Sequence, residues 1–133
     1  MSDESRLAQT VANHPESRPF WEAAAEGRFV IPHCTGCGRH HWYPRALCPF
    51  CFSTQIEWRP ASGKGRIYSY TVMRRASVPY AIAYVTLEEG TTMLTNIVDC
   101  DLDALAVGQE VRLVFKTTGD LPLPMFAPVS TLA

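Results

Sequence analysis

The stretch CTGCGRHHWYPRALCPFC, residues 34–51, contains two C-x-x-C pairs. Cys34 and Cys37 form the first pair, and Cys48 and Cys51 form the second, with ten residues between the pairs. Two cysteines three positions apart on a tight turn can both point inward, and two such turns can face each other. The spacing therefore predicts a metal-binding ribbon with these four cysteines as its ligands.

The predicted site has four thiolate ligands, which leave no open coordination position for a substrate. A site of this kind is structural, and its metal-binding energy, on the order of 10 kcal/mol, becomes folding energy. Iron can occupy the same ligands, but zinc is the expected metal, with one ion per chain. We expect His33, His40 and His41, which stand beside the sulfur ligands, to face solvent or to surround the metal site.

The other features of the 133-residue chain predict a cytoplasmic protein with reduced thiols. Residues 1–15 are polar and lack the apolar segment of a secretory signal. No run approaches the ~18 apolar residues of a membrane span. In the cytoplasm, clustered cysteines more often bind metal than form disulfides. Cys100, the fifth cysteine, is expected to be a buried small hydrophobic residue rather than a nucleophile.

The net charge of −1 is unevenly distributed along the chain. Residues 1–32 carry −2, residues 33–80 carry +6, and residues 81–133 carry −5. The near-zero total disfavours a general nucleic-acid coat protein, which has a basic excess. The basic middle segment is either an ordinary solvated surface or a site for an anionic ligand.

A short helix precedes the cysteine stretch in the predicted structure. Ser17 is expected to cap this helix, with Pro19 in its first turn, and the helix is expected to end at Gly27. It carries two large aromatic side chains, Phe20 and Trp21. These rings either pack in the core or dock on a partner.

Short strands account for most of the remaining chain, so the predicted fold class is mainly β. Strands are expected at residues 29–32, 66–74, 80–87, 91–98, 111–115 and 125–129. Residues 88–90 are expected to form a hairpin turn. The last five strands, within about 65 residues, predict a small closed barrel of the OB type, although an SH3-like barrel fits the same count.

The first predicted barrel strand supplies candidate ligand-binding side chains. Strict alternation places Arg66, Tyr68, Tyr70, Val72 and Arg74 on one face of this strand. The alternative is that the tyrosines are barrel packing and that the arginines are solvated or make structural salt bridges. The full set of candidates for an anionic ligand is Arg45, Arg66, Tyr68, Tyr70, Arg74, Arg75 and Tyr80.

A series of motifs in fixed order resembles one known family. In chain order the motifs are Phe20-Trp21, the C-x-x-C-G at 34–38, Pro44-Arg45, the C-P-x-C at 48–51, Gly63-x-Gly65, Pro79-Tyr80, the LEEG at 87–90 and the VGQEV at 107–111. Together they resemble the OB-fold acyl-CoA-associated zinc-ribbon family, domain of unknown function thirty-five, over residues 17–128. Tyr43 departs from the family pattern, which often has a second proline at that position.

The resemblance implies an architecture and a function class. It implies an N-terminal helical arm at residues 1–28, a rubredoxin-like zinc ribbon at 29–60 and a C-terminal five-stranded OB fold at 61–133. Members of the family accompany thiolases, aldolases or enoyl-CoA hydratases and are thought to bridge subunits or to help bind acyl-CoA. The expected assembly is a hetero-oligomer or a homodimer, with Phe20 and Trp21 as candidate partner contacts and no membrane association.

Three functions are compatible with these residues. The first is a non-catalytic scaffold or binding subunit for an enzyme of CoA thioesters, whose phosphates and adenine match the arginines and tyrosines. The second is binding of single-stranded nucleic acid, which an OB barrel supports but the acidic C-terminal third opposes. The third is an enzyme, which the residues support least because no spacing joins a base to a nucleophile. Its acid–base candidates are His33, His40, His41, Glu57, Glu88, Glu89 and Asp99.

Overall fold

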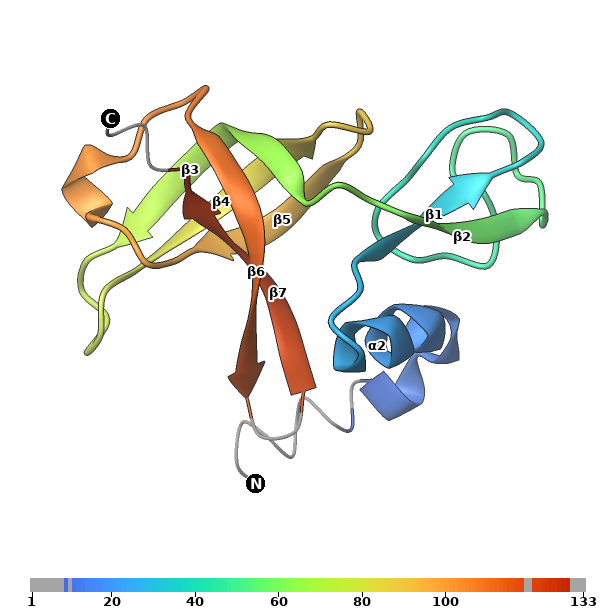
Figure 1. Ribbon diagram of the computed structural model, residues 1–133, viewed down its shortest axis with the longest axis horizontal. Coiled ribbons are helices and arrows are strands. Elements are labelled where there is room, and N and C mark those ends of the chain that lie inside the picture. Colours follow the sequence, from blue (N-terminus) through green and yellow to red (C-terminus); the bar gives the residue numbers. More distant parts are fainter. Residues whose placement is uncertain (1–8, 10, 119–120, 130–133) are drawn as a thin grey trace. The chain divides into compact units, whose positions relative to one another are not determined.

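The computed structural model describes residue 9, residues 11–118 and residues 121–129 (Figure 1). The chain divides into two compact units, residues 1–61 with 115–123 and residues 62–114 with 124–133. The first unit contains a short helix and a two-stranded ribbon, and the second contains most of a closed barrel. The division into segments 1–28, 29–60 and 61–133 stays a prediction, and the start of the first segment lies outside the described residues.

Helix α2, Arg18–Ala25, is stabilised by the burial of its apolar face. Phe20 is 1% exposed and lies on this face. The buried residues of the helix follow Phe20 at three and four positions, as expected for one face of an α-helix. The Phe20 ring makes edge contacts with Trp21 at 5.0 Å, Trp42 at 5.1 Å and Phe29 at 6.3 Å between ring centroids. The buried residues of α2 are Phe20, Ala23 and Ala24.

The start of α2 differs from the predicted capped start. A 3-10 turn, η1 at Pro15–Ser17, leads into the helix, and the Ser17 side chain makes no capping hydrogen bond. Its hydroxyl instead donates to the His14 carbonyl at 2.8 Å. The prediction of a Ser17 cap was therefore wrong, because the turn before the helix competes for the same hydroxyl. The helix ends before Gly27, whose φ of +77° is the left-handed conformation expected there.

The ribbon consists of strands β1, Val30–Cys34, and β2, Ile56–Pro60. The two strands are antiparallel, with Val30 opposite Pro60 and Cys34 opposite Ile56. Every residue of β1 is buried. This pairing brings the first cysteine to the end of a fixed strand and ties the two ends of the cysteine stretch together.

The barrel is built from five strands in the order β3-β4-β5-β7-β6, with β6 returning to β3. Their bounds are β3 Lys64–Met73, β4 Tyr80–Leu87, β5 Thr92–Ile97, β6 Glu110–Thr118 and β7 Leu121–Pro128, with a 3-10 turn, η2, at Leu102–Ala104. β3 pairs antiparallel with β4 and with β6, and β4 pairs antiparallel with β5, whereas β5 and β7 run parallel at Ile97 and Phe126. The predicted mainly β fold with a closed five-stranded barrel is confirmed.

The barrel core is formed by the inward-facing residues, which alternate with outward-facing residues along each strand. Val85 and Phe126 are 0% exposed. Gly65 lies opposite Val111 at a point where the wall is tight, and a Cβ there would lie 2.6 Å from Val85 Cγ1 and 2.9 Å from the Thr86 carbonyl oxygen. Only glycine therefore fits at position 65 without a shift of the wall.

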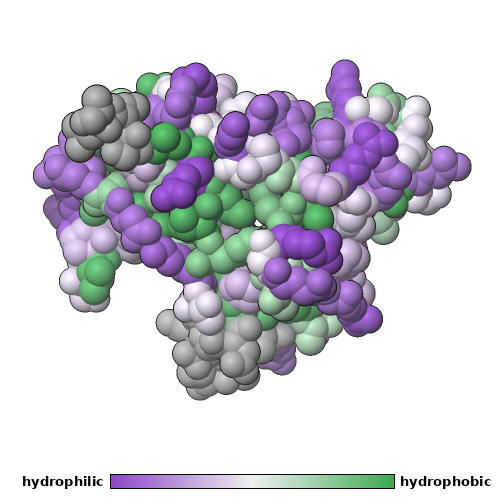
Figure 2. All heavy atoms as spheres, viewed as in Figure 1, coloured by the Kyte–Doolittle hydropathy of each residue, from purple (hydrophilic) through white to green (hydrophobic). Residues whose placement is uncertain are grey.

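The surface is mixed in character (Figure 2). Hydrophilic side chains cover much of the face in view, and hydrophobic ones gather over the barrel strands. In the part of the chain that the structure describes, no helix has the length and apolar character needed to cross a membrane.

Candidate functional site

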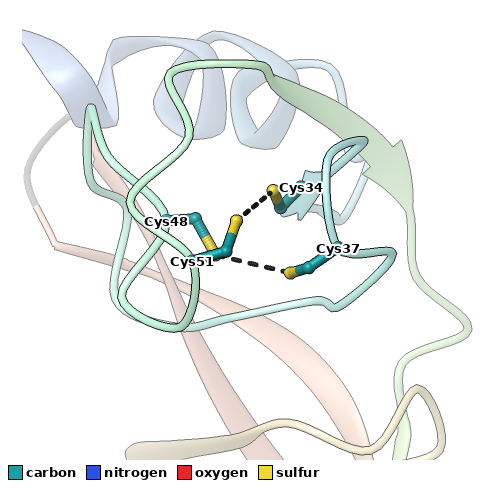
Figure 3. A group of neighbouring side chains, drawn as sticks. All are labelled: Cys34, Cys37, Cys48 and Cys51. Carbon is teal, nitrogen blue, oxygen red and sulfur yellow. Dashed lines mark hydrogen bonds between the residues drawn. The ribbon is translucent and has the colours of Figure 1, made fainter.

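The four predicted metal ligands meet at one point of the ribbon (Figure 3). All four Sγ atoms lie within 4.8 Å of one another, with 3.5 Å between Cys34 and Cys51 and 3.7 Å between Cys37 and Cys48. A tetrahedral zinc ion with 2.3 Å bonds to sulfur needs sulfur–sulfur edges of about 3.8 Å. The donor set and its spacing therefore fit one zinc ion in a closed, structural site.

The two cysteine turns have matching backbone geometry. The amide of Gly38 donates to the Cys34 carbonyl at 2.8 Å, and the amide of Phe52 donates to the Cys48 carbonyl at 3.0 Å. Both turns end on a residue in the left-handed region, with φ of +78° at Gly38 and +64° at Phe52. The second turn thus repeats the first with a residue that adopts this conformation at a cost.

We expect substitutions at these two positions to have unequal effects. Replacing Gly38 by alanine forces a side chain into the left-handed region, at a cost of about 1–2 kcal/mol in folding stability. Phe52→Gly relieves the corresponding strain but adds chain entropy to the unfolded state, so its net effect is less than about 1 kcal/mol. Denaturant unfolding of the zinc-loaded chain measures both changes. Equal losses in the two variants would contradict the assignment of matching turns.

Local hydrogen bonds and crowding set the ionisation of the thiols. Burial opposes ionisation of Cys48, but the backbone amides of Cys51 and Phe50 lower the pKa of this thiol to about 7. The Ser53 amide favours ionisation of Cys51, yet the neighbouring thiols raise the pKa of Cys51 to about 12. The cluster therefore retains protons that a divalent cation displaces when it binds.

The ribbon histidines are placed differently from one another. His33 and His41 are 6% and 1% exposed, so the alternative that they face solvent was wrong. His33 Nε2 lies 3.2 Å from the Gly38 carbonyl oxygen and so braces the first cysteine turn. Burial, with Arg45 and His40 nearby, lowers the pKa of His41, which keeps its ring neutral inside the unit.

A β-bulge rearranges the predicted ligand face on β3. Ile67 lies opposite Val85 and Ser69 lies opposite Tyr84, so Tyr68 is an extra, unpaired residue. The bulge shifts all later residues of β3 to the opposite face. The prediction that Arg66, Tyr68, Tyr70, Val72 and Arg74 share one face was therefore wrong.

The barrel arginines among the candidates already have partners. The Arg66 guanidinium lies 2.7 Å from the Glu110 carboxylate and also donates to the Gly108 carbonyl at 3.2 Å. Arg74, which follows the end of β3, pairs with Asp103 at 2.7 Å. Arg66 and Arg74 are eight positions apart in the sequence, which corresponds to a distance of about 25 Å along an extended strand. They therefore do not belong to one small site.

The remaining candidates are dispersed as well. The Tyr70 hydroxyl donates to the Leu105 carbonyl at 2.8 Å, which is a structural contact. Tyr68 and Tyr80 are 69% and 41% exposed. Arg75 lies exposed in the turn after β3, and Arg45 lies exposed on the ribbon loop. A ligand role for these residues stays a prediction.

Phe20 and Trp21, the candidate partner contacts, have different environments. Phe20 packs in the core of the first unit, whereas Trp21 is half-buried. Of the two, Trp21 alone has ring surface that a partner could reach in this conformation.

Comparison with known proteins agrees with both parts of this geometry. The family model described as "ChsH2, rubredoxin-like zinc ribbon domain" matches residues 21–57, and "ChsH2, C-terminal OB-fold domain" matches residues 58–116. A "DUF35 domain-containing scaffold protein" of Methanothermobacter thermautotrophicus is 40% identical over 90 residues, or 62% of this chain and 68% of that protein.

The chain belongs to the DUF35 family. It is also similar to a "Probable enoyl-CoA hydratase alpha subunit" of Thermomonospora curvata, with 36% identity over 116 residues. That match includes 82% of this chain but 36% of the hydratase subunit, so the DUF35 chain spans about a third of this longer relative. A solved structure named "Ltp2-ChsH2(DUF35) aldolase" matches with a TM-score of 0.74 and 34% identity, over 84% of this chain and 93% of that chain.

Two cations of the DUF35 barrel were not among the predicted ligand residues. Lys64 and Arg112 lie directly opposite each other on β3 and β6. Arg112 belongs to the acidic C-terminal third of the sequence, so the segment charges gave no reason to select it. Its place beside Lys64 depends on how the barrel closes.

Proposed function

We propose that this chain is a non-catalytic subunit that binds and organises an enzyme of CoA thioesters, with a thiolase, aldolase or enoyl-CoA hydratase as its partner. The similarity to the solved DUF35 chain of the aldolase structure, over 93% of that chain, is the observation that carries the proposal. The similarity to a scaffold protein and to a hydratase alpha subunit supports the same class of role.

The chemistry of the described residues fits a structural role for this chain. The four-thiolate metal site is closed and would hold zinc as a structural ion, with Cys34, Cys37, Cys48 and Cys51 as its ligands. Glu57 pairs with Arg59, and the Glu89 carboxylate accepts a hydrogen bond from the Ser62 amide. Both carboxylates thus make contacts within the chain, and in this proposal the acid–base step belongs to the partner.

The outer face of β3, β4 and β5 argues against the nucleic-acid alternative. The residues of this face are the ones that alternate with the buried residues along each strand. Beyond the bulge in β3 they are Ser69, Thr71, Met73, Tyr80, Ile82, Tyr84, Thr86, Thr92, Leu94 and Asn96. This part of the face offers tyrosines for stacking but no arginine or lysine, and the cations Lys64 and Arg66 lie at the start of β3, where Arg66 is paired with Glu110. Phosphate contacts dominate the binding of nucleic acid, so the separation of the tyrosines from the cations disfavours it.

The proposal places the chain in the cytoplasm, where CoA thioesters are processed and where thiolate ligands stay reduced. The assembly is a hetero-oligomer with the partner enzyme. A homodimer of this chain inside that assembly is compatible with the proposal.

Co-purification from the native host tests the proposal. The chain carries a C-terminal tag, and size exclusion is followed by identification of the proteins in each peak. We expect a thiolase, aldolase or hydratase subunit to co-elute with the chain in fixed stoichiometry. Elution of the chain by itself, together with turnover of a CoA thioester by that fraction, would show that it is an enzyme and overturn the proposal.

A further inference from the structure

Lys64 and Arg112 form a cross-strand pair of like charges. They are directly opposite in the register of β3 and β6, and the next pair along is Gly65 with Val111. Val111 is 1% exposed and faces the barrel core. Because strand side chains alternate, Lys64 and Arg112 both project from the outer side of the barrel.

Neither of these cations has a counter-ion among the residues that the structure describes. In the described residues, the side chains of Lys64 and Arg112 make no ion pair, whereas Arg66 on the same strand pairs with Glu110 at 2.7 Å. Like charges directly opposite each other destabilise a pair of strands. An anion bound between the two side chains would remove this repulsion.

The pair lies on a groove of about 700 Å³ in the barrel unit, a volume within the range of small-molecule sites. Leu87, Val111 and Val129 are the apolar residues of the lining, and Val129, at 38% exposed, supplies the accessible apolar side chain because the other two are buried. Two carboxylates also line it, and the Glu110 carboxylate is neutralised by Arg66. Lys64, Arg66 and Arg112 outnumber Glu88 and Glu110 by one in the lining, so the groove suits a ligand with both an anionic and an apolar portion.

We propose that this groove binds a phosphate-bearing ligand, with a phosphate group held between Lys64 and Arg112. Phosphate oxygens accept charge-assisted hydrogen bonds from both cations, and the apolar lining receives the rest of the ligand. If the proposed function holds, the ligand is the nucleotide end of a CoA thioester. Free polyphosphate offers the same chemistry, and the experiment separates the two sources.

Isothermal titration calorimetry on the zinc-loaded full chain provides the test, with CoA, pyrophosphate and phosphate-free pantetheine as probes. The double variant Lys64→Gln, Arg112→Gln removes both charges and keeps much of the side-chain bulk. Arg18→Gln is the matched control, because Arg18 is an exposed arginine of α2 outside the groove. Thermal melting of each variant checks that it remains folded.

We expect CoA to bind the wild type and the double variant to bind it at least about tenfold more weakly, as two lost charge-assisted contacts imply. Arg18→Gln is expected to change the affinity less than twofold. The double variant is expected to melt no lower than the wild type, because it loses a repulsion. CoA affinity well above that for pyrophosphate identifies a CoA thioester as the source, and equal affinities identify free polyphosphate.

Three results would overturn the groove proposal: pantetheine binding as tight as CoA binding, unchanged CoA affinity in the double variant, or no binding of any probe. Partner capture is measured separately. A chain that co-elutes with its partner but fails these titrations leaves the proposed function standing. A chain that passes them and captures no partner retains the groove and loses the proposed function.

Discussion

Replacing Cys34 by serine is expected to release the metal ion and unfold the ribbon. Cys34 is 0% exposed, lies at the end of β1, and has its sulfur 3.5 Å from that of Cys51. A structural zinc site contributes on the order of 10 kcal/mol to folding, which is comparable to the whole stability of a small domain. Elemental analysis is expected to fall from one zinc per chain to well below one.

The chain contains its own control for this substitution. Cys100 is half-buried outside the ribbon, and burial, with Asp101 and Asp99 nearby, raises the pKa of its thiol. Cys100→Ser is expected to retain one zinc per chain and a melting temperature within a few degrees of the wild type. Full zinc content in Cys34→Ser, or equal metal loss in the two variants, would contradict the four-cysteine assignment.

Phe20→Ala is expected to cost about 3–5 kcal/mol of unfolding free energy, as for other buried aromatic residues. The ring is 1% exposed and contacts Trp21, Phe29 and Trp42 at 5.0, 6.3 and 5.1 Å. Removing it leaves a cavity between α2 and the ribbon residues that cover it. Denaturant unfolding followed by tryptophan fluorescence measures the loss, because two of the contacting rings are tryptophans.

Phe50→Ala is the matched control for Phe20→Ala. Phe50 is 52% exposed, and its ring lies under the Arg39 guanidinium at 4.8 Å. Loss of this contact is expected to cost no more than about 1 kcal/mol. If Phe20→Ala keeps wild-type stability and loses partner capture instead, Phe20 contacts the partner and the core assignment is wrong.

The parts of the fold that depend on local spacing could be predicted from the sequence. The two C-x-x-C pairs specify their own turns, and four sulfurs within 4.8 Å are the outcome. The strand at 80–87 and the turn at 88–90 follow from alternation and from Gly90, whose φ is +98°. The beginning of β7, by contrast, was not predicted, because Pro122 and Pro124 lie there and prolines donate no backbone hydrogen bond to a neighbouring strand.

The parts that depend on strand pairing could not be predicted. The bulge at Tyr68 inserts one extra residue in β3 relative to its partner strand β4. The alternation of apolar and polar residues within β3 gives no sign of this insertion. The opposition of Lys64 and Arg112 likewise appears only when the first and fourth strands of the barrel pair. A charge count along the chain separates these two residues, since one lies in the basic segment and the other in the acidic segment.

Native mass spectrometry of the untagged complex from the host is the most direct test of the central claim, that this chain is a zinc-stabilised subunit of a CoA-thioester enzyme. We predict a stoichiometric assembly with a thiolase, aldolase or hydratase subunit, and one zinc ion for each copy of this chain. A chain that is found only by itself or with nucleic acid, or one that lacks zinc, would contradict the account.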